Sequence, residues 1–161
     1  MGESRLALGM VPAPARELFE SAELMLAHTR TVTDVNLRYS LAHRCALRIA
    51  AGVLAVRAKK AATTSPLVRV RRSRPQSAWA ILRAVAPEMV EWADYFATHA
   101  PIREAAEAGS SFITARMADD AIRDAVAFMT DAVAVASGTG TCAVRGIVSD
   151  SPYVEAAMHA G

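Results

Sequence analysis

Four polar residues on one strongly helical stretch are the main candidates for carrying chemistry. Arg38, His43, Arg44 and Arg48 lie between Leu37 and Arg57, where the other residues are mostly apolar or small. Histidine can move protons near neutral pH, and arginine can stabilise anionic charge such as that of a phosphate. On one helix a step of five residues, from Arg38 to His43, corresponds to about 140°. These two side chains therefore do not converge without a second chain or a distorted first turn.

The stretch from Leu37 to Arg57 is predicted to be the central helix of the fold. It contains no proline, and its apolar or small residues recur in steps of three and four. Further apolar residues widen this stripe almost to a full circumference, which predicts a helix that is buried on most sides. Three neighbouring helices would not need so much apolar surface, so the pattern favours a homodimer.

Length and composition favour a single helical domain. The chain has 161 residues, of which 53% are hydrophobic and only 6% aromatic, and abundant alanine suits closely packed helices. The two cysteines, Cys45 and Cys142, form no disulfide framework, which fits a cytoplasmic protein. The sequence has neither a signal-peptide pattern nor an apolar run of membrane-spanning length, so no membrane association is expected.

Helix-starting residues place the first two helices. Pro14 suits the first position of a helix that runs to about His28. A polar turn follows, in which Asp34 or Thr33 can accept the free N–H groups at the start of the central helix. Residues 1–13 show no helical period and are expected to form a flexible arm.

Proline and glycine divide the rest of the chain. Ser77 is expected to cap a third helix, which must kink or restart at Pro87 because proline removes a helical hydrogen bond. Pro101 then opens a short helical piece that Gly109 ends in a left-handed conformation. Thr114 caps the last strong helix.

The predicted fold is all-α, an antiparallel bundle of four to five helices over residues 14–136. A glycine-rich run ends the last helix, and residues 137–161 are expected to form a disordered or loosely packed tail. Large apolar residues at helical spacing supply the expected core: Phe19, Met25, Ala46, Ile49, Val53, Trp79, Leu82, Trp92, Phe96, Ile122, Phe128 and Met129.

Charge is distributed very unevenly along the chain. Between Val35 and Pro87 there are eleven Lys and Arg residues and no Asp or Glu, whereas the other segments hold seven bases and all sixteen acids. Such a basic block attracts phosphates or an acidic protein partner. The alternative is that the acidic helices fold against the basic block and cancel its charge.

The densest part of the basic block, residues 59–75, is predicted to be a surface loop. A loop of this length is uncommon in a compact domain unless it is functional or disordered, so it is either a phosphate-binding arm or a solvated linker. The expected nucleic-acid contacts come from this loop and from the central helix: Arg44, Arg48, Lys59, Lys60, Arg69, Arg71, Arg72 and Arg74.

Metal and cofactor sites are not expected. None of the four histidines, His28, His43, His99 and His159, lies at metal-ligand spacing with another His, Cys or carboxylate. The sequence also lacks the glycine-rich and nucleophile motifs of the common enzyme classes.

Three segments make the chain resemble the HEPN superfamily, in particular its alanine-rich actinobacterial members. They are RYSLAHRCALRIAAGVLAVRA, SAWAILRAVAPEMVEWADYFA and ARMADDAIRDAVAFM. The resemblance covers about residues 14–135 and includes the amphipathic first helix. It implies a small helical bundle, commonly dimeric, that is either a metal-independent ribonuclease or a binding module for RNA or protein.

The resemblance also implies roles for two residues. Many members use an arginine and a histidine separated by four to six residues, and this spacing matches Arg38 and His43. His43 would then be the acid or base of RNA cleavage and Arg38 the phosphate clamp. Two functions therefore stay open. The first is a non-catalytic module that binds RNA or a protein partner through the basic segment, and the second is a metal-independent endoribonuclease.

Overall fold

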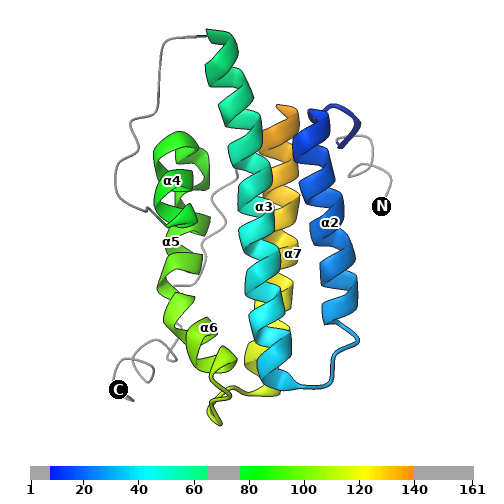
Figure 1. Cartoon of the computed structure of the whole chain (residues 1–161), viewed down its shortest axis with the longest axis vertical. Coiled ribbons are helices and arrows are strands. Elements are labelled where there is room, and N and C mark those ends of the chain that lie inside the picture. The colour runs from blue at the N-terminus through cyan, green and yellow to red at the C-terminus, as the bar shows by residue number, and fades with distance from the viewer. Residues whose placement is uncertain (1–7, 65–76, 140–161) are drawn as a thin grey trace.

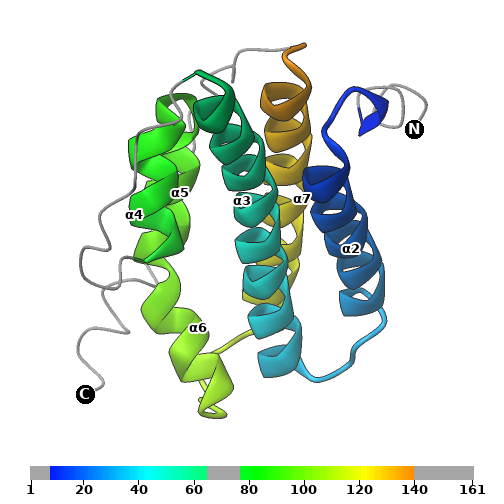
Figure 2. The ribbon, with the colours of Figure 1, turned by 45° about the horizontal axis from the view of Figure 1, so that its top comes forward.

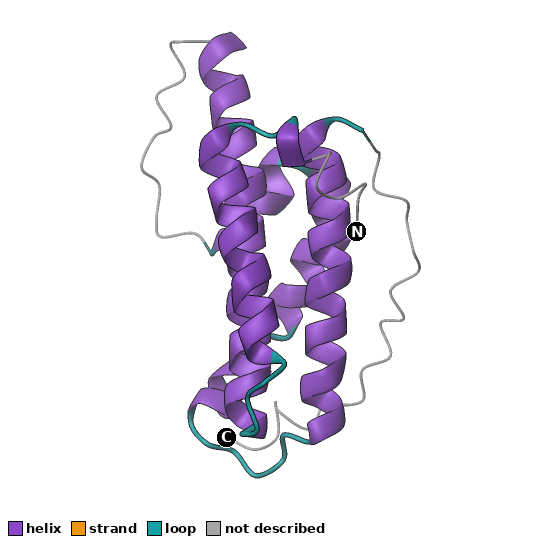
Figure 3. Cartoon of the chain, turned by 90° about the vertical axis from the view of Figure 1, so that its right-hand side faces the viewer, coloured by secondary structure: helices purple, strands orange, loops and turns teal. Residues whose placement is uncertain are grey.

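The computed structural model describes residues 8–64 and 77–139, and within these ranges it contains helices and no strand (Figure 3). The all-α prediction is confirmed. The elements follow the chain in this order: α2 (Ala13–Thr29), α3 (Val35–Thr64), α4 (Ala78–Val85), the 3₁₀ helix η1 (Pro87–Met89), α5 (Val90–Thr98), α6 (Ala100–Glu107) and α7 (Ala115–Ser137).

Helix α3 is the centre of the bundle. It packs against α2 and α7 over much of its length and against α4 and α6 on another side. Figures 1 and 2 show this arrangement, with α2 and the α4–α6 arm on opposite sides of α3. Four helices of the same chain therefore cover α3, one more than the three considered from the sequence.

The predicted core is confirmed. All of its residues are buried except Met25. Met25 is partly buried and packs against the main cluster of buried apolar residues. Trp79 and Phe96 stack with their ring centroids 5.1 Å apart. A second, smaller cluster forms where α6 and α7 meet the first turns of α3, and it includes Tyr39 and Ile102. The first turns of α3 thus have an apolar cluster of their own.

Side-chain caps account for the starts of α3, α4 and α7. The carboxylate of Asp34 accepts a hydrogen bond from the backbone N–H of Leu37 at 2.7 Å. Ser77 and Thr114 each accept from the backbone N–H three residues further on, both at 3.2 Å. These contacts satisfy donors that have no partner inside the helix. Ser77 and Thr114 were predicted as caps, and Asp34 was one of two candidates beside Thr33.

Proline and glycine interrupt the helices where the sequence indicated. Pro87 begins η1, so the helical path restarts there. Gly109 and Gly138 have φ of 77° and 74°, a conformation that glycine adopts without strain, and they follow α6 and α7. The break at Pro87 separates α4 from α5, and each of the two helices supplies one aromatic ring that contacts His43 of α3.

Two predicted boundaries need correction. Helix α3 continues to Thr64, so residues 59–64 are helical and do not belong to a loop. Lysine and alanine are good helix formers, which explains why the helix continues past Arg57. Leu8 and Val11 belong to the main core cluster, so the end of the predicted arm packs against the bundle.

The remaining predictions for the basic loop and the two ends fall outside the described residues. These are residues 1–7, 65–76 and 140–161. No helix in the described ranges is both long and apolar enough to cross a membrane.

Candidate functional site

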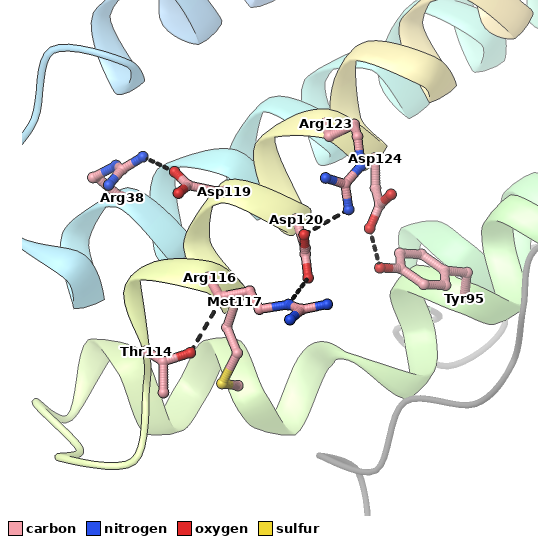
Figure 4. Close-up of polar contacts among 9 residues, drawn as sticks. All are labelled: Arg38, Tyr95, Thr114, Arg116, Met117, Asp119, Asp120, Arg123 and Asp124. Atoms are coloured by element: carbon pink, nitrogen blue, oxygen red, sulfur yellow. Dashed lines mark hydrogen bonds and ion pairs between the residues drawn. The ribbon is translucent and has the colours of Figure 1, made fainter.

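Arg38 lies near the start of α3 and points toward α7 (Figure 4). Its guanidinium donates a hydrogen bond to the carboxylate of Asp119. The Nε atom of Arg38 is buried and has no hydrogen-bond partner, and only 18% of the side chain is exposed, against 59% for Asp119. The positive charge of Arg38 is therefore paired with the carboxylate of Asp119, and this ion pair joins α3 to α7.

His43 lies five residues further along α3 and is only 3% exposed. Its ring packs edge-on against Trp79 and Phe96, with centroid distances of 5.8 and 5.6 Å. Burial lowers the pKa of His43 to about 4, and the nearby positive charge of Arg103 adds to this effect. At neutral pH the imidazole is thus uncharged and enclosed by aromatic side chains.

The structure does not bring Arg38 and His43 together. Arg38 contacts Asp119 on α7, whereas His43 packs between residues of α4 and α5. This separation agrees with the angle of about 140° that a regular helix places between them. Within the described part of the single chain, Arg38 and His43 therefore do not face one common phosphate position.

The other residues of α3 that were predicted to contact nucleic acid fall into two groups. Arg44 and Arg48 have side-chain partners within the bundle, and Lys59 and Lys60 are exposed at the end of the helix. Arg44 forms an ion pair with Glu107 at 3.2 Å, and Arg48 donates to the hydroxyl of Ser21 at 2.6 Å. Lys59 and Lys60 are exposed on the last turns of α3, which extend beyond the neighbouring helices in Figure 1. The other four predicted contacts, Arg69, Arg71, Arg72 and Arg74, lie outside the described residues.

Acidic residues of the later helices compensate part of the basic block. Four of its arginines have a carboxylate partner on η1, α5, α6 or α7. The pairs are Arg57 with Glu88, Arg83 with Asp94, Arg44 with Glu107 and Arg38 with Asp119. For these four arginines, the structure supports the alternative that carboxylates of the later helices compensate the positive charge of the basic block.

A small pocket lies between α3, α5 and α7, with room for little more than a water molecule. Six residues line it: Tyr39, His43, Tyr95, Phe96, His99 and Ala121. Four of these side chains carry hydrogen-bonding groups, although the wall is otherwise aromatic. Polar groups that converge in an apolar pocket are a common feature of ligand sites.

Hydrogen bonds fix the α5 side of this pocket. The hydroxyl of Tyr95 donates to the carboxylate of Asp124 on α7 (Figure 4). The Nδ1 atom of His99 lies 2.7 Å from the backbone oxygen of Tyr95, and the two rings lie against each other with centroids 4.2 Å apart. Burial raises the pKa of Tyr95 and of Tyr39, so both phenols stay protonated.

This pocket was not predicted from the sequence, although the sequence contains a signal for it. The pattern Tyr-x-x-x-His occurs twice, as Tyr39 to His43 and as Tyr95 to His99. Residues four apart lie on one face of a helix, so each pattern places a phenol next to an imidazole. What the sequence does not reveal is that α3 and α5 direct these faces toward the same place.

The described residues contain no group of three or more His, Cys, Asp or Glu side chains that could hold a metal ion. Cys45 is buried, and burial raises the pKa of its thiol to about 11. A thiol with such a pKa is unreactive at neutral pH.

A long central helix covered by shorter helices of the same chain defines the class of this protein as a small helical-bundle domain. The sequence model of the SAV_6107-like HEPN family matches residues 29–133. This match covers more than half of the chain, which therefore belongs to that HEPN family. No curated protein and no solved structure matches the chain.

Proposed function

We propose that this protein is a non-catalytic HEPN module that binds RNA through its basic segment, residues 59–75. The burial of His43 carries the non-catalytic part of the proposal. An acid or base must reach the proton that it transfers, but His43 is 3% exposed and its pKa is about 4. Arg38 is likewise engaged with Asp119.

The distribution of paired arginines supports binding through residues 59–75. Four arginines of the described bundle, Arg38, Arg44, Arg57 and Arg83, already have acidic partners. The six bases of residues 59–75 follow one another without a single acid. A run of this kind is the electrostatic signature of phosphate-backbone binding.

A salt titration tests this proposal. Binding of labelled single-stranded RNA should weaken steeply with salt, since each neutralised phosphate contributes roughly −0.7 to the log–log slope. Replacing Arg69, Arg71, Arg72 and Arg74 by Gln should reduce the slope by about three units. The Lys59→Gln/Lys60→Gln variant should reduce it by about 1.4.

A matched control removes two charges elsewhere. Arg16→Gln/Arg116→Gln changes exposed arginines of α2 and α7 and should leave the slope unchanged. Equal slopes in the parent and the segment variants would contradict RNA binding through residues 59–75. RNA affinity that is weak at low salt would point instead to an acidic protein partner.

A further inference from the structure

The ring of His43 lies at the junction between α3 and the α4–α6 arm, residues 78–107. The imidazole packs edge-on against Trp79 of α4 and Phe96 of α5, and neither of these rings can ionise. Only 3% of His43 is exposed, and the pocket beside it has room for little more than one water molecule. A charged imidazole in this position would therefore lose most of its hydration.

The groups that face His43 from the arm add positive charge. Arg103 of α6 and His99 of α5 both oppose a positive charge on the imidazole. Glu107 of α6 favours such a charge, but this carboxylate already accepts from Arg103 at 2.7 Å and pairs with Arg44 at 3.2 Å. A proton on His43 thus brings like charges together across the contact between α3 and the arm.

The other polar neighbours do not compensate a charge on His43. Tyr39 of α3 and Tyr95 of α5 line the same pocket. Burial raises the pKa of both phenols, so they stay neutral in acid as at pH 7. From α7, the carboxylate of Asp124 is engaged by the hydroxyl of Tyr95. A charged His43 is therefore better accommodated in water, which it reaches when the arm separates from α3.

The contacts of α2 and α7 with α3 lie elsewhere. In Figure 1 the arm and α2 lie on opposite sides of α3, and α2 and α7 pack against α3 over much of its length. The arm is joined to α7 by two hydrogen bonds, from Trp92 to Asp131 at 2.9 Å and from Tyr95 to Asp124. Opening of the arm breaks these bonds, so the open form is rare at pH 7.

We propose that His43 is an acid-sensitive contact whose protonation favours opening of the α4–α6 arm while α2, α3 and α7 stay packed. Opening exposes the rings of Trp79 and Phe96 that the imidazole covers. The change is confined to one part of the chain, which distinguishes it from a general loss of stability in acid. His43 and the arm lie outside residues 59–75, so the test below does not depend on RNA binding.

Amide hydrogen exchange of the full chain at pH 7 and pH 5 tests the proposal. Rates are corrected for the intrinsic effect of pH and compared between peptides of the arm and peptides of α2 and α7. If the open arm restores the pKa of His43 from about 4 to its ordinary 6.5, the opening equilibrium constant should rise about twenty-fold. Protection of the arm should fall by this factor, and protection of α2 and α7 should change much less.

Two variants and a control assign the response to His43. His43→Gln has no ionisable ring, so the fall in protection of the arm should largely disappear. Arg103→Gln removes the nearby charge that most strongly opposes a proton on His43, so it should reduce the response without touching the ring. His28→Gln replaces an exposed histidine of α2 and should keep the full response. Circular dichroism at pH 7 checks the fold of each variant.

Three results would overturn the proposal. Equal loss of protection in the arm, α2 and α7 would mean that acid unfolds the whole bundle. Unchanged protection of the arm between pH 7 and pH 5 would show that the junction does not respond to acid. A full response in His43→Gln would assign the opening to another titrating group.

Discussion

Arg38 of α3 donates a hydrogen bond to Asp119 of α7, a residue 81 positions further along the chain. The arginine that the HEPN resemblance identified as a phosphate clamp is thus part of a contact between two helices. Its charge is already compensated within the chain. An incoming phosphate would have to compete with Asp119 for the guanidinium.

We therefore expect no ribonuclease activity from the pair Arg38 and His43. Purified protein incubated with mixed RNA in the presence of EDTA should release no cleavage products, because His43 is buried and neutral. A metal-independent ribonuclease serves as the positive control. Cleavage by the parent that disappears in both Arg38→Ala and His43→Ala would establish the endoribonuclease reading instead.

Stability should depend on pH through His43. The folded pKa is about 4, below the ordinary value of 6.5, so the unfolded chain binds more protons between these two values. The contribution of His43 is fully present above about pH 7 and is lost as the pH falls from 6.5 to 4. The free energy of unfolding should decrease by about 3 kcal/mol over this interval from His43 alone.

Urea denaturation at pH 7, 6, 5 and 4 measures this change. His43→Gln removes the titrating ring and should give a flatter dependence on pH, whatever its stability at pH 7. His28→Gln, which replaces an exposed histidine of α2, is the control and should keep the parent's slope. Parallel curves for the parent and His43→Gln would show that the imidazole is not buried as described.

Gly52→Ala should destabilise the contact between α2 and α3. A Cβ atom at this position would lie 2.7 Å from Cε1 and 2.8 Å from Cζ of Phe19. The ring of Phe19 is fully buried, so it cannot move aside without disturbing the core. The expected cost is about 1–3 kcal/mol, measured by urea denaturation at pH 7.

Two variants check the cause of this loss. At Gly9 an added Cβ meets no atom within 4 Å, so Gly9→Ala should change the unfolding free energy little. Phe19→Leu destabilises the core by itself, but it should reduce the additional cost of Gly52→Ala in a double-mutant cycle. Strictly additive effects would argue against a clash between the two side chains.

We expect the protein to form a twofold dimer, as the HEPN resemblance implies. Several large apolar side chains of the described helices remain exposed: Leu24, Leu37, Ile81, Val85 and Val90. Covering such side chains with a second copy would remove them from water. Light scattering at tens of micromolar should give twice the chain mass, and a monomer mass there would contradict the expectation.

The sequence predicted the features that depend on local signals. Helical spacing identified the core from Phe19 to Met129, and single residues such as Asp34 and Thr114 identified helix starts. These signals are readable because a cap or an apolar stripe involves residues within one or two turns of each other.

Features that depend on packing between distant segments were not predictable in the same way. The pairing of Arg38 with Asp119 and of Arg57 with Glu88 requires the relative positions of helices that the sequence does not specify. The two Tyr-x-x-x-His patterns were visible, but only the packing of α3 against α5 and α7 makes them one pocket. The end of α3 was misplaced because a basic composition resembles that of a loop.

The central position of α3 also has a consequence for the order of folding. Helix α2 can pack against α3 as soon as both are made, because they are adjacent in sequence. Helix α7 covers another part of α3 but is synthesised only after α4, α5 and α6. During translation, the part of the apolar surface of α3 that α7 covers therefore stays exposed until α7 leaves the ribosome, and such exposed apolar surface makes a nascent chain prone to aggregate.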